Sequence, residues 1–209
     1  MNVSLWSERS DVCKGAAYDQ RWTALQATGQ CIHGEADLVA QLLEDFGRGP
    51  EPQVLDAGCG TGRVAIELDR RGIATVGVDL DPAMLTEAKR KAAHLRWLEA
   101  DLCDLDIEPS FDLVVLAGNV LIFLKPGSEA AVLRNMARHL QPGGLLLAGF
   151  QLHRLSLADY DRYANTAGLT LVDRWATWGK DRYRDGDYAV SLHQINNSIS
   201  SSNTPTKMP

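Results

Sequence analysis

From residue 53 onward, short apolar runs alternate along the chain with longer segments in which apolar residues recur at helical spacing. The apolar runs predict seven β-strands, at residues 53–57, 74–78, 95–100, 111–117, 145–150, 169–178 and 188–195. Helices are predicted between them, at residues 63–71, from residue 82 onward, at 128–140 and at 158–167. Strands that alternate with helices are typical of repeated βαβ units and a parallel sheet.

The sheet is predicted to be buried on both faces and to end in a hairpin. The run from Phe111 to Ala117 is apolar almost throughout, which indicates a strand covered on both sides. A charged turn region at residues 179–186 joins the last two runs, so the final strand is expected to run antiparallel to the others. The predicted fold class is therefore α/β, a three-layer α/β/α sandwich around a mostly parallel seven-stranded sheet with its last strand antiparallel.

Composition and pattern divide the chain into three parts. Two helices are predicted near the N-terminus, at residues 18–27 and 35–46, and we expect residues 1–34 to form a helical extension or lid. Residues 35–195 hold the alternating pattern and are expected to form the main domain. Residues 196–209 are polar and rich in Ser, Thr and Asn, so they bury too little apolar surface to offset the entropy of ordering. We expect them to be a disordered tail.

The strongest chemical signal lies where the first strand runs into a glycine-rich loop that opens a helix. Glycines at positions 58, 60 and 62 let backbone N–H groups approach a ligand without hindrance from Cβ atoms. A dinucleotide-binding fingerprint requires G-x-G-x-x-G, but Arg63 occupies the position of its third glycine. Asp56 adds a carboxylate that repels phosphates and suits a cationic ligand. The pattern therefore disfavours a pyrophosphate site.

This segment, from Val54 to Arg63, resembles the first motif of the class I S-adenosylmethionine-dependent methyltransferases. The resemblance covers about residues 35–195 and implies a Rossmann-like fold. It also implies S-adenosylmethionine as the cofactor, S-adenosylhomocysteine as the product, and a loop that holds the amino-acid end of the cofactor. On this resemblance Asp56, Gly58 and Gly60 are cofactor-binding residues.

The end of the second predicted strand offers a site for the cofactor's ribose. Asp79 follows the glycines by about 20 residues, and a carboxylate there is able to accept two hydrogen bonds from ribose hydroxyls. The resemblance then places Leu80 against the adenine. Asp81 is the rival for the ribose, but it directly precedes Pro82 and is better explained as the N-cap of a helix.

The resemblance assigns roles to residues after the third and fourth strands as well. Asp101 and Leu102 match the position that binds adenine, where an acid accepts a hydrogen bond from the adenine amino group. One alternative is that Asp101 only caps a turn. Another is that the nearby Asp104 binds the adenine, although it lies beyond the predicted end of the strand. Asn119 falls where the family borders the cofactor sulfur and the acceptor pocket.

Two residues before the second predicted helix are further candidates for cofactor binding. His33 and Glu35 resemble an N-terminal segment of some small bacterial relatives, in which a side chain touches the methionine carboxylate or ammonium. An acid in a first helical turn is also favoured by the helix dipole alone, so Glu35 has an equally good structural explanation.

Composition and motifs exclude several other classes of protein. The formal net charge of −6 and the absence of N-P-P-Y and Pro-Cys motifs argue against a nucleic-acid substrate. The four cysteines have no zinc-like spacing, so no metal is expected. The longest apolar run, residues 113–124, is too short to span a membrane, and the N-terminus has no secretory apolar stretch. We therefore expect a cytoplasmic protein that acts away from membranes.

The function predicted is transfer of a methyl group from S-adenosylmethionine to an unidentified small-molecule acceptor. No pair of base and orienting residue is evident, so the catalytic residues stay unknown, and the pattern says nothing of the oligomeric state. The missing base motivates one alternative, a non-catalytic S-adenosylmethionine-binding protein. A nicotinamide-dependent oxidoreductase is a second alternative, which Asp56 and Arg63 disfavour.

Overall fold

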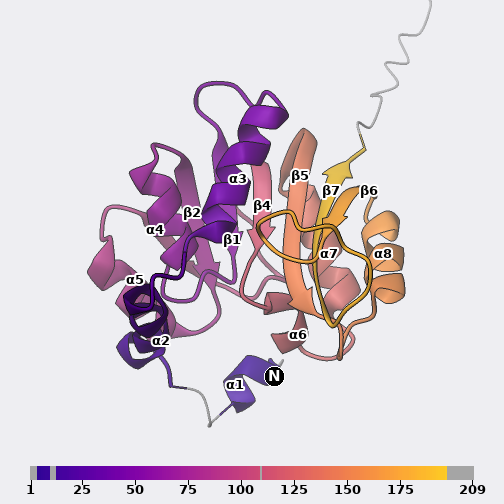
Figure 1. The fold of residues 1–209 in the computed structure, drawn as a ribbon. Coiled ribbons are helices and arrows are strands. Elements are labelled where there is room, and N and C mark those ends of the chain that lie inside the picture. The colour runs from indigo at the N-terminus through magenta and orange to yellow at the C-terminus, as the bar shows by residue number, and fades with distance from the viewer. Residues whose placement is uncertain (1–3, 10–12, 109, 197–209) are drawn as a thin grey trace, which may run out of the picture.

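The computed structural model describes residues 4–9, 13–108 and 110–196, in which a central seven-stranded sheet lies between layers of helices (Figure 1). The strands are β1 (Gln53–Ala57), β2 (Ala74–Asp79), β3 (Arg96–Glu99), β4 (Phe111–Leu116), β5 (Leu140–Gln151), β6 (Leu169–Trp175) and β7 (Tyr188–Ile195). Their order across the sheet is β3-β2-β1-β4-β5-β7-β6, and β7 alone runs in the direction opposite to the other six strands. The predicted α/β fold, with its last strand antiparallel, is confirmed.

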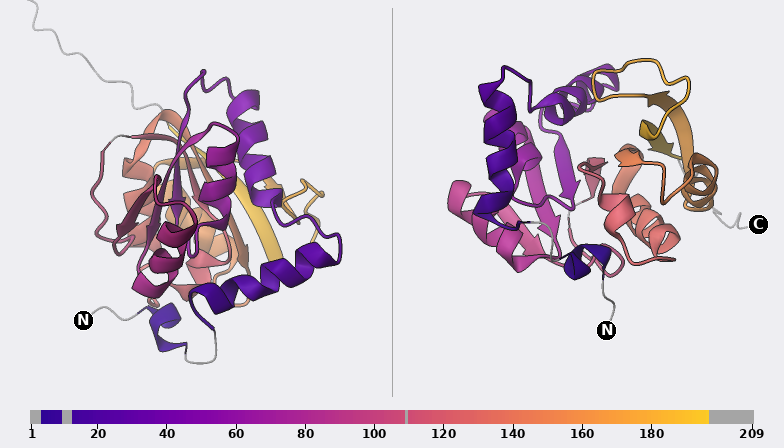
Figure 2. Two further views of the ribbon diagram at one scale, coloured as in Figure 1. Left: turned by 90° about the vertical axis from the view of Figure 1, so that its left-hand side faces the viewer. Right: turned by 60° about the horizontal axis from the view of Figure 1, so that its bottom comes forward.

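Helices cover both faces of the sheet and also lie along one of its edges. They are α1 (Leu5–Glu8), α2 (Ala16–Ala27), α3 (Gly34–Asp45), α4 (Arg63–Arg70), α5 (Pro82–Lys91), α6 (Val120–Phe123), α7 (Glu129–Arg138) and α8 (Leu157–Thr166). The core contacts place α3 and α4 on one face and α7 and α8 on the other. Helices α1 and α2 lie at the edge towards which the parallel strands point (Figures 1 and 2). Within the described ranges, no helix has both the length and the apolar character needed to cross a membrane.

Strand β4 shows why the centre of the sheet is fixed in register. Leu113 and Val115 pack into the cluster that contains α3 and α4, whereas Val114 and Leu116 pack into the cluster that contains α7 and α8. All six of its residues are buried, as the apolar run predicts. A slip of one residue would exchange the two sets of side chains, so the position at which each strand ends is strongly specified.

Two predicted helix boundaries are confirmed by local geometry. The side chain of Asp81 accepts a hydrogen bond from Ala83 N at 2.9 Å, and Pro82 follows as the first residue of α5. Gly72 follows the end of α4 with φ +78°, a left-handed conformation that suits glycine after a helix. Asp81 is therefore an N-cap, as its position before a proline indicates.

Other boundaries differ from the predictions. Strand β5 begins at Leu140, five residues earlier than predicted, because Leu140 already pairs with Phe111 of β4. The next pair is Leu145 with Leu113, so the residues between Leu140 and Leu145, which include Pro142–Gly144, form a bulge-like irregularity. The sixth strand ends three residues earlier than predicted, at Trp175. Helices α1 and α6 have four residues each and were not predicted, since such short elements show no periodicity. The predicted tail lies outside the described residues after Asn196, and the division into extension, domain and tail stays a prediction.

Candidate functional site

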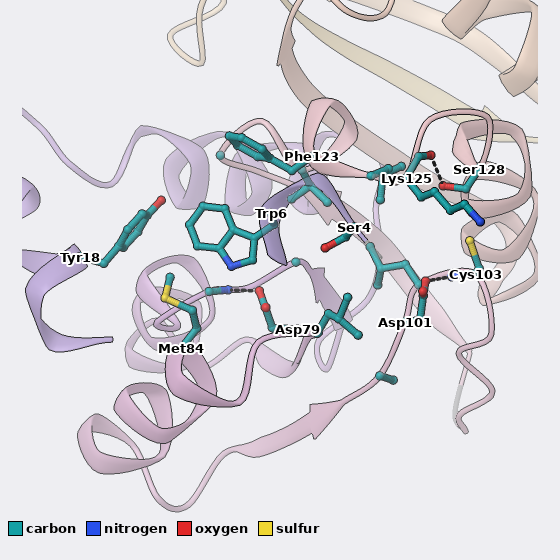
Figure 3. Close-up of a pocket in the computed structure, with 18 residues that line it drawn as sticks. Ser4, Trp6, Tyr18, Asp79, Met84, Asp101, Cys103, Phe123, Lys125 and Ser128 are labelled. Atoms are coloured by element: carbon teal, nitrogen blue, oxygen red, sulfur yellow. Dashed lines mark hydrogen bonds between the residues drawn. The ribbon is translucent and has the colours of Figure 1, made fainter. Parts of the chain in front are cut away.

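Two adjoining cavities open at the carboxyl ends of β1, β2 and β4. The first, shown in Figure 3, has about 840 Å³ of space including the part open to solvent. The second lies beside it, at the start of α4. Among the described residues, Tyr18, Gly58, Gly60 and Gly118 line both cavities. These shared residues mark the junction of one continuous site.

The glycine loop forms the floor of this junction. Gly58 has φ +80°, and its N–H donates to Val78 O at 2.8 Å. A Cβ atom at Gly58 would lie 2.5 Å from a methyl carbon of Val120, on the far side of the site. Gly60 also has a positive φ, of +56°. The loop thus needs glycine both for its backbone conformation and for its close approach to α6.

Asp56 places a carboxyl group behind the second cavity. Its side chain is only 1% exposed, and one oxygen accepts a hydrogen bond from Ala65 N at 3.1 Å. Burial raises the pKa of Asp56 to about 7, although the Ala65 hydrogen bond and the nearby Arg63 charge act in the opposite direction. A cation that approached this carboxyl group would favour its charged form. The geometry therefore suits a positively charged ligand group, as the sequence suggests.

Asp79 lies at the end of β2 and faces the first cavity, next to Leu80. Its two oxygens accept hydrogen bonds from Gly60 N at 2.7 Å and from Asp81 N at 2.9 Å. Each carboxylate oxygen has a second lone pair, which stays available to a ligand hydroxyl. Burial raises the pKa of Asp79, and these backbone hydrogen bonds lower it in part. The carboxylate is thus fixed in orientation before any ligand arrives.

The rival acid, Asp81, has partners of a different kind. Besides capping α5, its carboxylate contacts Lys14 Nζ at 2.8 Å and accepts a hydrogen bond from Trp6 Nε1 at 2.8 Å. It ties the N-terminal segment to the sheet, and it does not line either cavity among the residues that the structure describes.

Asp101 and Leu102 both line the first cavity, beyond the end of β3. One oxygen of Asp101 accepts a hydrogen bond from Cys103 N at 2.9 Å, which is the geometry of a side chain that caps a turn. The two interpretations offered by the sequence are therefore compatible, because the same carboxylate caps the turn and borders the cavity.

Three further candidates lie near the site, but they are not among the described residues that line the two cavities. Glu35 makes a two-pronged ion pair with Arg63, with one contact at 2.8 Å. His33 has its Nδ1 atom 3.7 Å from a carboxylate oxygen of Glu67. Asn119 has φ +67°, and its side-chain oxygen accepts a hydrogen bond from the backbone of β5, at 2.9 Å. Their assignment to cofactor binding stays a prediction.

The outer wall of the first cavity comes from residues that the sequence did not single out as binding residues. The Trp6 ring lies over the cavity with its centroid 5.9 Å from that of Tyr18 and 5.4 Å from that of Phe123 (Figure 3). Ser4 and Met84 complete this part of the lining.

One signal in the sequence points to helix α2, which supplies Tyr18 to both cavities and Arg21 and Trp22 to the second. Helix α2 carries Tyr18, Arg21 and Trp22 at spacings of three and four residues, which places them on one face of the helix. The helix has no buried residue, so this aromatic and basic face is not explained by packing into the core. Such a face beside a glycine loop favours contact with a ligand.

The two cavities together suit a nucleoside with a charged side arm. The first combines apolar walls from Leu80 and Leu102 with the carboxylates of Asp79 and Asp101. The second combines the buried Asp56 with the glycine loop at the start of a helix. S-adenosylmethionine carries an adenosine and a positively charged amino-acid arm, which match these apolar walls and carboxylates. The residues present therefore fit the cofactor that the resemblance implies.

The comparison with known proteins agrees with this geometry. A family model described as a methyltransferase domain matches residues 54–144. The crystal structure of a TehB-like S-adenosylmethionine-dependent methyltransferase from Corynebacterium glutamicum superposes with a TM-score of 0.78 and 34% sequence identity. That match covers 86% of this chain and 97% of the Corynebacterium chain.

Curated relatives match over part of their length. Cypemycin N-terminal methyltransferase from a Streptomyces species is 38% identical over 94 residues, which is 44% of this chain and 38% of that protein. Trans-aconitate 2-methyltransferase from Methylobacterium nodulans is 31% identical over 171 residues, which is 66% of this chain and 65% of that protein. The chain therefore spans less than two thirds of the length of these relatives, and the two act on different acceptors by their names.

Proposed function

Because this chain belongs to the class I S-adenosylmethionine-dependent methyltransferases, we propose that it methylates a small-molecule acceptor. The observation that supports the site is the set of three carboxylates, Asp56, Asp79 and Asp101, which lie at the carboxyl ends of β1, β2 and β3 and border two joined cavities. The family match gives no support to a nicotinamide-dependent oxidoreductase.

Each part of the cofactor has a matching set of residues in this proposal. Asp79 binds the ribose hydroxyls, while Leu80, Asp101 and Leu102 surround the adenine. Asp56 and the backbone of the glycine loop take the amino-acid end. When bound, S-adenosylmethionine supplies an electrophilic methyl group on its sulfonium. The sulfonium joins the adenosine to the amino-acid end, so in this proposal it lies at the junction of the two cavities, beside the residues that both cavities share.

The acceptor is proposed to need no strong base from the protein. No histidine is among the described residues that line the two cavities. Burial raises the pKa of the Tyr18 hydroxyl, so this group stays protonated near neutral pH. Acceptors that carry a free lone pair near neutral pH fit such a site because they require no base from the protein before attack. Carboxylates meet this condition, and so do amines of low pKa, such as an α-amino group with a pKa of about 8.

The first test is calorimetric titration with S-adenosylhomocysteine, with NAD as the parallel ligand. Saturable binding of S-adenosylhomocysteine alone is expected. Protein incubated with S-adenosylmethionine and panels of amines or carboxylic acids is then assayed for release of S-adenosylhomocysteine. The names of the relatives, which point to a peptide N-terminus and to trans-aconitate, motivate these two panels. NAD binding without S-adenosylhomocysteine binding contradicts the proposal, and cofactor binding without turnover favours the non-catalytic alternative.

A further inference from the structure

Arg21 holds a guanidinium group at the second cavity, on a helix outside the sheet. It lines this cavity together with Asp56 and the glycine loop. Its Cζ atom lies 3.8 Å from the ring centroid of Tyr18 and 4.3 Å from that of Trp22, and one of its nitrogens donates to the Tyr18 hydroxyl. The residue is exposed to solvent. Two aromatic surfaces therefore fix the planar group at the mouth of the cavity.

The two described carboxylates whose charges act on Arg21, those of Asp19 and Glu35, are engaged by other groups. Arg63 lies 4.1 Å from the same Trp22 ring, but Glu35 neutralises it through the two-pronged ion pair. Asp19, on the same helix as Arg21, is engaged by Thr61 and Lys91. Within the described ranges, no carboxylate oxygen is placed to form an ion pair with Arg21. Burial lowers the pKa of Arg21, and the nearby charge of Arg63 acts in the same direction.

This arrangement specifies the chemistry of the missing partner. A guanidinium group presents a planar fork of N–H donors that matches a carboxylate. Asp56 lies on the wall of the same cavity and suits a cation. An α-amino acid carries both charges on one carbon, so the cavity complements each of them. We propose that Arg21 binds a carboxylate in the second cavity, an inference that deepens the proposed function and rests on it.

Two ligands of the same site carry this group. One is the amino-acid end of the cofactor, and the other is an acidic acceptor. Both ligands carry a carboxylate. If the cofactor supplies it, Arg21 makes its contact when S-adenosylhomocysteine binds alone, whereas an acidic acceptor makes the contact only when it binds itself. Binding measurements distinguish them without any need for turnover.

The test compares R21Q and R21K with the wild type and with R90Q. Arg90 is the matched control, because it pairs with Glu87 on α5, is 69% exposed and lies outside both cavities. Each protein is titrated with S-adenosylhomocysteine and with the analogue of it that lacks only the carboxylate. Protein already loaded with S-adenosylhomocysteine is then titrated with trans-aconitate and other di- and tricarboxylates. Thermal melting checks the fold, and a shift of no more than about 2 °C is expected because α2 buries no residue.

If the cofactor supplies the carboxylate, R21Q weakens S-adenosylhomocysteine binding by about 10-fold. The loss disappears with the decarboxylated analogue, R21K shows a smaller loss, and R90Q binds as the wild type. If an acidic acceptor supplies it, R21Q keeps its affinity for S-adenosylhomocysteine and loses the binding of an acid probe.

Two results would overturn the inference. One is an equal loss of both adenosine ligands in R21Q, which indicates a purely structural role for Arg21. The other is unchanged binding of S-adenosylhomocysteine with no acid probe lost. Failure of the wild type itself to bind S-adenosylhomocysteine would instead count against the proposed function.

Discussion

The two halves of the cofactor site are built in different ways. The inner half consists of strand ends and the glycine loop, and it includes the buried Asp56 and the part-buried Asp79, which are both held by backbone hydrogen bonds. The outer half consists of helices α1 and α2, and no residue of either helix is buried. It is attached by side-chain contacts, such as those of Asp81 with Trp6 and Lys14.

This contrast indicates in which half of the site the same residues determine both the stability of the fold and the binding of the ligand. In the inner half, the contacts that shape the cavity also hold the fold together, so a substitution there should affect both. In the outer half, the contacts are few and partly exposed, so a substitution should change ligand binding and leave the free energy of unfolding nearly unchanged.

The largest effect is expected for Gly58→Ala in the inner half. The alanine would have to adopt the positive φ of Gly58, and its Cβ atom would lie 2.5 Å from a methyl carbon of Val120. Left-handed strain and overpacking together should lower the free energy of unfolding by about 2–4 kcal/mol and also weaken S-adenosylhomocysteine binding. Denaturant unfolding and calorimetry measure the two effects.

Gly47→Ala provides the matched control. Gly47 also has a positive φ, of +61°, but no atom lies within 4 Å of a Cβ built there. It should lose only the strain contribution, about 1–2 kcal/mol, and keep its affinity for the ligand. Equal destabilisation of the two variants would show that the approach of Val120 to the loop is unimportant.

Asp79→Ala should give the next largest effect, and mainly on binding. The substitution removes the carboxylate proposed to bind the ribose and frees Gly60 N from its acceptor. We expect the affinity for S-adenosylhomocysteine to fall by roughly 1–3 kcal/mol. The Asp101→Ala variant, measured by the same titration, reports on the adenine end. Unchanged affinity in Asp79→Ala would mean that the ribose lies elsewhere.

The inner half could be predicted from the sequence because periodicity and topology determine it. Buried parallel strands give apolar runs, and the carboxyl ends of such strands meet at one edge of the sheet. Asp56, Asp79 and Asp101 therefore converge as soon as the strands are recognised. The bulge at the start of β5 was missed because its glycines read equally well as a turn.

The outer half left no such pattern. Helix α1 is four residues long, and α2 has no apolar face towards the core. The contact between Trp6 and Asp81 joins residues 75 positions apart, and the pair of Lys91 with Asp19 joins residues 72 apart. Polar contacts of this kind depend on tertiary geometry and leave no mark on local periodicity. The sequence shows the type of side chain but not its partner.

The third prediction concerns Asp56 and pH. Its pKa is about 7 in the folded protein and near 3.8 when unfolded, so between those values the folded state retains a proton that the unfolded state has lost. The free energy of unfolding should therefore fall as the pH rises from about 4 to about 7. An ammonium group beside Asp56 favours its charged form, so S-adenosylhomocysteine binding should tighten over the same window, by up to about tenfold per pH unit.

Titrations and melts between pH 5.5 and 7.5 test both trends. Asp56→Asn keeps the shape of the side chain but does not titrate, so both profiles should flatten in this variant. A wild-type binding profile that is flat over this range would show that no cationic group approaches Asp56.

The smallest effect is expected for Trp6→Ala, and it tests the contrast most directly. Trp6 contacts Tyr18, Phe123 and Asp81 but lies outside the buried core. Its removal should weaken S-adenosylhomocysteine binding by about 0.5–1.5 kcal/mol, the worth of an aromatic contact, with almost no change in melting temperature. Trp6→Phe keeps the ring contacts and loses the hydrogen bond to Asp81, so it separates these two contributions. If Trp6→Ala instead lowered the melting temperature as much as Gly58→Ala, the N-terminal segment would belong to the cooperative core, and the two halves of the site would not differ in kind.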